Sequence, residues 1–154
     1  MRVLVIEDGV EYSELLQRFL GEGFAWERAG SGPAALRRLE GEPFDAIFLD
    51  MRFDRAPEGE LLGDLEAVAD RFNGDPVQAR RYIEDHQGTF VLAALREAGR
   101  PEPVLMSYDF DGEPRRWERL AARYGPVAYL PDNASPADIA GRLRALVEDA
   151  RRGR

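Results

Sequence analysis

Near the end of its first third the chain reads Phe44-Asp45-Ala46-Ile47-Phe48-Leu49-Asp50, an almost unbroken apolar run that ends on a carboxylate. A short apolar run that is rich in strand-forming residues is typical of a strand buried on both faces, as in the centre of a parallel sheet. In open α/β sheets the ligand crevice lies beyond the carboxyl ends of the strands. We therefore expect Asp50 to lie at the mouth of such a crevice.

The rest of the chain alternates between predicted strands and helices. Apolar runs predict strands, and segments with helical spacing and capping signals predict helices between them. The strands are expected at residues 2–6, 24–29, 44–49, 103–107 and 127–130, and the helices between and after them at 10–20, 31–41, 89–99, 114–124 and from 135 onward. Units of this β-α-β type wind right-handed into a parallel sheet, so an α/β fold is predicted.

The alternation is interrupted after Asp50. Residues 60–72 have a clean helical period, and Asp75-Pro76 is typical of a helix start that leads to a second helix ending near Gly88. Thr89 is expected to cap the next helix. We predict a single domain over residues 1–154 with a helical insertion at about 54–87. The insertion's apolar stripe must be buried against the domain itself or against a partner, and it consists of Leu61, Leu65, Val68 and Phe72.

Composition narrows the possible functions. The chain has 44% hydrophobic and 32% charged residues, as in ordinary globular proteins, and no apolar run approaches the length that spans a bilayer. It contains no cysteine, which excludes disulfides and thiolate metal sites. Its net charge of −8 argues against nucleic-acid binding. We expect a cytoplasmic protein that binds neither nucleic acid nor membrane.

Three carboxylates follow two strands that should be neighbours. Glu7 and Asp8 come directly after the first strand, and Asp50 ends the third. Mg²⁺ prefers oxygen ligands of this kind, and acids held close together repel one another unless a cation or a proton lies between them. Any one of them alone could simply cap a helix or face solvent. All three at corresponding strand ends favour a metal site.

These runs resemble the receiver domain of bacterial two-component response regulators. The first run, Val3-Leu4-Val5-Ile6-Glu7-Asp8, is similar to the family's first strand and acidic pair, and residues 44–50 are similar to its third strand with the phosphoacceptor aspartate. The fourth and fifth strands of the family are matched by Val104-Leu105-Met106-Ser107 and Ala128-Tyr129-Leu130.

The resemblance implies a flavodoxin-like (βα)5 fold, a doubly wound five-stranded parallel sheet in the strand order 2-1-3-4-5. It implies that Asp50 accepts a phosphoryl group from a histidine kinase, a phosphotransfer protein or a small phosphodonor, and that the domain then acts on a downstream protein. Ser107 would hydrogen-bond the phosphoryl group and Tyr129 would be the aromatic switch. Mg²⁺, or Mn²⁺ in its place, would be held by Glu7, Asp8, Asp50 and the backbone carbonyl of Arg52.

One departure leaves two functions open. Receivers carry a lysine after the fifth strand that pairs with the phosphoryl oxygens, but Asp132 stands there and the chain contains no lysine. The chain is therefore expected to be either an atypical stand-alone receiver in a phosphorelay or a non-phosphorylated pseudo-receiver that binds a protein partner. No catalytic residue is expected. A phosphatase of the haloacid dehalogenase type would need a second acid two residues after Asp50, where Arg52 stands.

Overall fold

The computed structural model describes residues 1–153. Its five strands form one parallel sheet in the order β2-β1-β3-β4-β5, which confirms the predicted fold class. The strands are β1 (Arg2–Ile6), β2 (Ala25–Ala29), β3 (Ala46–Asp50), β4 (Val104–Ser107) and β5 (Val127–Leu130). Each predicted strand matches an observed one to within two residues at either end.

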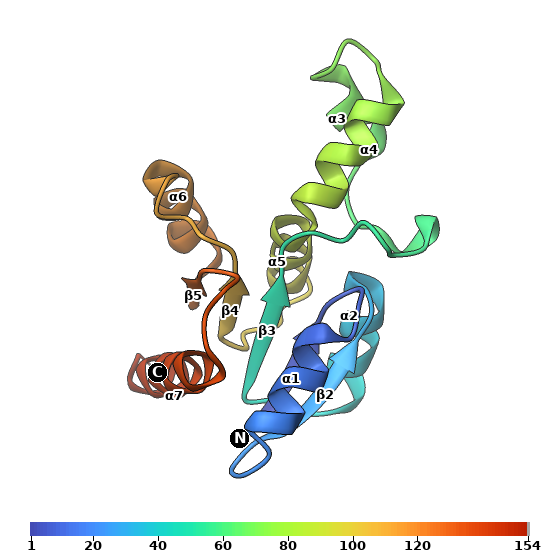
Figure 1. The fold of residues 1–154 in the computed structure, drawn as a ribbon. Helices are drawn as coiled ribbons and strands as arrows, with labels where there is room; N and C mark the ends of the chain where they lie inside the picture. The colour runs from blue at the N-terminus through green and yellow to red at the C-terminus, as the bar shows by residue number, and fades with distance from the viewer. Residues whose placement is uncertain (154) are drawn as a thin grey trace.

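Helices cover both faces of the sheet (Figure 1). One face carries α1 (Glu11–Phe19) and α7 (Pro136–Arg152). The opposite face carries α2 (Gly32–Gly41), α5 (Gln87–Glu97) and α6 (Pro114–Tyr124). Within residues 1–153, none of the helices combines the length and the apolar character needed to cross a membrane.

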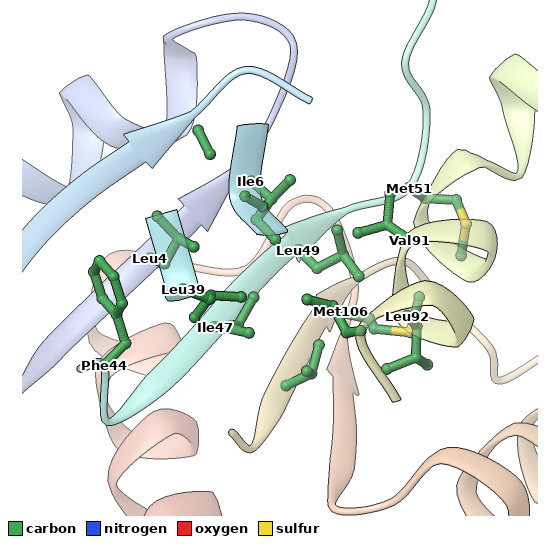
Figure 2. Close-up of a cluster of buried hydrophobic side chains, with 14 of the residues drawn as sticks. Leu4, Ile6, Leu39, Phe44, Ile47, Leu49, Met51, Val91, Leu92 and Met106 are labelled. Carbon is green, nitrogen blue, oxygen red and sulfur yellow. The ribbon is translucent and has the colours of Figure 1, made fainter. Parts of the chain in front are cut away.

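The alternation of side chains along each strand divides the core into two layers. Leu4 and Ile6 of β1 point to the face covered by α2 and α5, whereas Val3 and Val5 point to the face covered by α1 and α7. Figure 2 shows the first layer, in which Ile47 and Leu49 of β3 lie among side chains from the flanking strands and helices. Because both faces are covered, the central strands are apolar at nearly every position.

Two helix starts follow directly from the sequence. The Ser31 hydroxyl accepts a hydrogen bond from the Ala34 amide, 3.1 Å away, and Pro33 follows in the first turn of α2. The Ser135 hydroxyl accepts one from the Asp138 amide at the start of α7, also at 3.1 Å. Each cap satisfies an amide that has no partner within its helix.

The insertion forms an arm that projects beyond the carboxyl end of β3 (Figure 1). It contains a short 3₁₀ helix at Glu58–Glu60, then α3 (Leu65–Asp70) and α4 (Pro76–Asp85). Apolar side chains of α3 and α4 pack against each other, with Val68, Ala69, Ala79 and Ile83 buried between them. Of the apolar stripe, Val68 is buried in the arm and Leu61 and Phe72 are partly buried against it, whereas Leu65 is 44% exposed.

Two helix boundaries in this region were predicted wrongly. The helix expected at residues 60–72 begins only at Leu65, because Gly63 has a left-handed φ of 127° and the Asp64 carboxylate caps the helix by accepting from the Ala67 amide. Thr89 lies inside α5, where its hydroxyl donates to the His86 carbonyl, 2.7 Å away, and caps no amide. Helical periodicity alone did not locate these breaks.

A buried glutamine fixes the arm to the domain. Gln87, at the start of α5, is fully buried, and its side-chain amide donates to the Leu62 carbonyl (2.9 Å) and accepts from the Leu62 amide (2.8 Å). The Phe53 amide, just after β3, donates to the Glu84 carbonyl at the end of α4 at 2.9 Å. The arm is thus bonded to the segment that follows Asp50.

Candidate functional site

The carboxyl ends of β3 and β4 form an open cleft. Asp50 and Ser107 are paired in the register of these strands, so their side chains meet at one edge of the sheet. The cleft has a volume of about 470 Å³ and is lined by Asp50, Met51, Arg52, Asp85, Ser107, Tyr108, Asp109 and Asp132. Four of these residues are aspartates and one is an arginine, which makes the cleft acidic.

Asp50 lies at the floor of this acidic region. Its Oδ1 accepts a hydrogen bond from the Met51 amide at 2.9 Å. Burial raises the pKa of Asp50 to about 6, and the charges of Asp8 and Glu7 act in the same direction, whereas the Met51 amide opposes them. Asp50 therefore lies close enough to both acids to interact with their charges.

Glu7 is directed toward a helix. Glu7 is only 1% exposed. Its two carboxylate oxygens accept hydrogen bonds from the Tyr12 amide (3.1 Å) and the Ser13 amide (2.7 Å). Burial raises the pKa of Glu7, and these amides oppose the rise. Glu7 thus satisfies free amides at the start of α1, which is the helix-capping role that the sequence had left open.

Asp8 is bound by an arginine from the segment after β3. The Asp8 side chain is 2% exposed, and its Oδ2 accepts from the Arg55 amide at 2.6 Å. Its Oδ1 lies 3.6 Å from Nη2 of the Arg55 guanidinium, which also makes a two-pronged ion pair with Glu11 at 2.7 and 3.0 Å. The Asp8 carbonyl in turn accepts from Arg28 at 3.1 Å.

In this arrangement the oxygens of Glu7 and Asp8 are already occupied by protein donors. Mg²⁺ requires nearly octahedral oxygen ligands and retains several waters. Within residues 1–153, no group of three or more acidic, histidine or cysteine side chains is placed to hold a metal ion. Both oxygens of Glu7 face amides, and those of Asp8 face Arg55. Binding of Mg²⁺ or Mn²⁺ stays a prediction.

Ser107 already has a hydrogen-bond partner. The Tyr12 hydroxyl lies 2.6 Å from the Ser107 hydroxyl and donates to the Asp132 carbonyl at 3.2 Å. The ring of Tyr12 packs edge-on against Phe48, with the centroids 4.9 Å apart. Tyr12 lies in the helix predicted at residues 10–20 and was not predicted to be part of the site. Its position in the first helical turn after the acidic pair could have predicted that it lies at the cleft.

Tyr129 lies in an aromatic group beside α6. Its ring packs edge-on against Phe110 and Trp117, with centroid distances of 5.3 and 4.7 Å, and its hydroxyl donates to the Asp111 carboxylate at 2.5 Å. Asp132 is exposed and lines the cleft. The structure therefore brings Asp50, Ser107 and Asp132 together, whereas Tyr129 points toward α6.

Comparison with solved structures identifies this architecture. The receiver domain of the Francisella response regulator 1452 is 18% identical, with 96% of this chain and 97% of that chain covered and a TM-score of 0.65. A CheY-like receiver domain protein from Methanospirillum hungatei is 14% identical, with coverages of 99% and 98% and a TM-score of 0.66. The chain has the receiver fold. The chemotaxis regulator CheY4 of Vibrio cholerae is similar too, at 18% identity, coverages of 94% and 97% and a TM-score of 0.62.

The likeness to the receiver fold is one of structure. A comparison with models of protein families and one with curated proteins each found no match for this chain. At identities below 20% the shared fold does not transfer residue roles, so the roles in this receiver fold have to be argued from its own side chains.

Gly88 lies at a close contact between the start of α5 and the end of β3. Its amide donates to the Met51 carbonyl at 2.9 Å, and a Cβ at this position would lie 2.6 Å from the Asp50 carbonyl oxygen and 2.9 Å from Met51 Cα. These are backbone atoms, which cannot rotate away. The start of α5 can therefore approach the end of β3 only because residue 88 has no side chain.

We expect Gly88→Ala to lower the free energy of unfolding by about 1–3 kcal/mol, because the end of β3 must move to admit the methyl group. Urea unfolding followed by circular dichroism measures the change. The control is Gly141→Ala in α7, where a Cβ would meet nothing within 4 Å and a gain of about 0.5–1 kcal/mol is expected. Equal effects of the two substitutions would contradict the close approach at Gly88.

Proposed function

We propose that this chain is a receiver-type signalling module that acts by binding a protein partner and is not phosphorylated at Asp50. The observation that carries the proposal is the chemistry around the position that a phosphoryl group on Asp50 would occupy. The Ser107 hydroxyl is engaged by Tyr12, and Asp132 places a carboxylate at the rim of the cleft. This is the second of the two functions that the sequence leaves open.

Charge is the physical reason for the proposal. Phosphoryl transfer to a carboxylate needs a cation to offset the charge on the phosphoryl oxygens. The cleft instead presents the carboxylates of Asp85, Asp109 and Asp132. Arg52 is the one cationic residue among those that line it, and its guanidinium pairs with Asp85 at 3.1 Å and with Asp54 at 3.4 Å. A phosphoryl group would therefore add negative charge to a region that is already acidic.

A second candidate function is the phosphorylated receiver, with Asp50 as acceptor from a histidine kinase or phosphotransfer protein. It is favoured by the pairing of Asp50 with Ser107 at the floor of an open cleft, where an in-line donor has access. Receiver domains are among the structural neighbours of the chain, and the sequence resemblance to this family implies partners of this kind. In either function the module is proposed to act through protein contacts and to carry no turnover chemistry of its own.

Intact mass spectrometry after incubation with acetyl phosphate distinguishes the two functions. We expect no phosphoryl adduct on the wild-type protein, with or without Mg²⁺, and the same mass for Asp50→Asn. A receiver domain that retains the lysine, incubated in parallel, establishes that the phosphodonor is active. An adduct on the wild type that disappears in Asp50→Asn would overturn the proposal and establish the phosphorylated receiver.

A further inference from the structure

We infer that Arg55 is a built-in cation that occupies the metal side of the acidic pocket and keeps divalent cations out. The inference goes beyond the proposed function, which concerns the phosphoryl side of the cleft. It rests on the contacts of Arg55 with Asp8 and Glu11 and on the shape of the turn beneath its guanidinium.

Arg55 compensates the burial of the Asp8 carboxylate. A carboxylate that is almost fully buried is costly unless it is paired and hydrogen-bonded. Arg55 supplies both, through its amide to Oδ2 at 2.6 Å and its guanidinium 3.6 Å from Oδ1. The same guanidinium holds Glu11 with two hydrogen bonds, the stronger arrangement for arginine and a carboxylate. Its hydrogen bonds to Glu11 lower the pKa of that carboxyl to about 2.

The turn after β1 is shaped to receive this guanidinium. At Gly9 a Cβ would lie 2.1 Å from Nη2 of Arg55 and 2.1 Å from Oε2 of Glu11, so a side chain there would force both groups to shift. The other end of the Arg55 segment is held in place because Phe53 is 1% exposed and its amide bonds to the Glu84 carbonyl. Arg55 is thus positioned by the buried Phe53 on one side and by the turn at Gly9 on the other.

A divalent cation would have to compete with this arrangement. To reach Asp8 it would need a carboxylate oxygen that now faces Arg55, and it would lie within a few ångströms of a guanidinium. At the effective dielectric constant of a partly buried site, removing one like charge at that distance strengthens the binding of a divalent cation by about tenfold or more. Glu7 offers no alternative, because both of its oxygens bind amides of α1.

Mn²⁺ titration followed by electron paramagnetic resonance tests this inference on the full chain. We expect Arg55→Gln to bind Mn²⁺ at least about tenfold more tightly than the wild type. The matched control is Arg37→Gln, because Arg37 is an exposed arginine of α2 that lies 3.9 Å from Glu60 and away from the pocket. The gain should disappear in Arg55→Gln/Asp8→Asn, since the metal then loses its carboxylate.

Gly9→Ala is a second variant that tests the inference, because its Cβ would force the guanidinium of Arg55 to shift. It should also gain Mn²⁺ affinity, which keeps the inference testable if Arg55→Gln does not fold. Equal affinity of the wild type and the folded variant, whether both bind Mn²⁺ or neither does, would overturn it. The titration needs no phosphodonor and no partner, so its outcome is independent of whether Asp50 is phosphorylated.

Discussion

Arg96→Met should lower the free energy of unfolding by about 3–4 kcal/mol, because four carbonyl oxygens lose a charged donor at once. The guanidinium of Arg96, on α5, donates to the carbonyls of Tyr124 (2.8 Å), Arg100 (2.7 Å), Glu102 (2.9 Å) and Pro126 (3.0 Å). These carbonyls belong to the last residue of α6 and to the segments that connect α5 to β4 and α6 to β5. One side chain therefore ties together the turns that precede the last two strands.

Methionine preserves most of the aliphatic stem of Arg96, so the substitution removes mainly the hydrogen bonds. Burial lowers the pKa of Arg96, with Glu102 opposing, yet an arginine in this position stays charged at neutral pH. The measurement is urea unfolding followed by circular dichroism, with Arg115→Met on the exposed side of α6 as the control. A loss below about 1 kcal/mol would mean that water replaces the guanidinium at little cost.

Asp50→Asn should raise the free energy of unfolding at pH 7 by about 2–3 kcal/mol. The pKa of Asp50 in the folded protein is about 6, above the value near 4 that a free aspartate has. The folded state consequently binds the proton more tightly than the unfolded state does. The stability that this tighter proton binding by Asp50 contributes is complete below about pH 4 and is lost as the pH rises through about 6. Asparagine does not ionise and so avoids this loss.

Unfolding of the wild type and Asp50→Asn at several pH values between about 4 and 8 measures the effect. The wild type should lose stability over this range, and the variant should lose less. Glu7 contributes in the same direction, because its pKa is also raised by burial, so the variant's curve is not expected to be flat. Asp109→Asn, at an exposed position of the same cleft, is the control. Parallel curves for wild type and Asp50→Asn would show that folding does not raise the pKa of Asp50.

Much of the fold could be predicted from local pattern. The apolar run that ends on Asp50 is typical of a strand buried on both faces, which the structure confirms, and the caps at Ser31 and Ser135 mark helix starts within one turn. The meeting of Asp50 and Ser107 was predictable as well, because parallel strands end at the same edge of their sheet. These features depend on burial and on chain direction, which neighbouring residues determine.

The partners of Asp8 and Ser107 were decided by the tertiary structure. Arg55 meets Asp8 from 47 residues away, and Tyr12 meets Ser107 from 95 residues away. Such pairs depend on how a loop is held and on which rotamer fits, as the close contact at Gly9 and the left-handed backbone at Gly63 illustrate. The sequence by itself determined that acids gather at one edge of the sheet. The capping of nearby amides by Glu7 was one of the roles that the sequence left open, whereas only the folded chain decided that Arg55 pairs with Asp8, because electrostatic pairing follows distance in space and not distance along the chain.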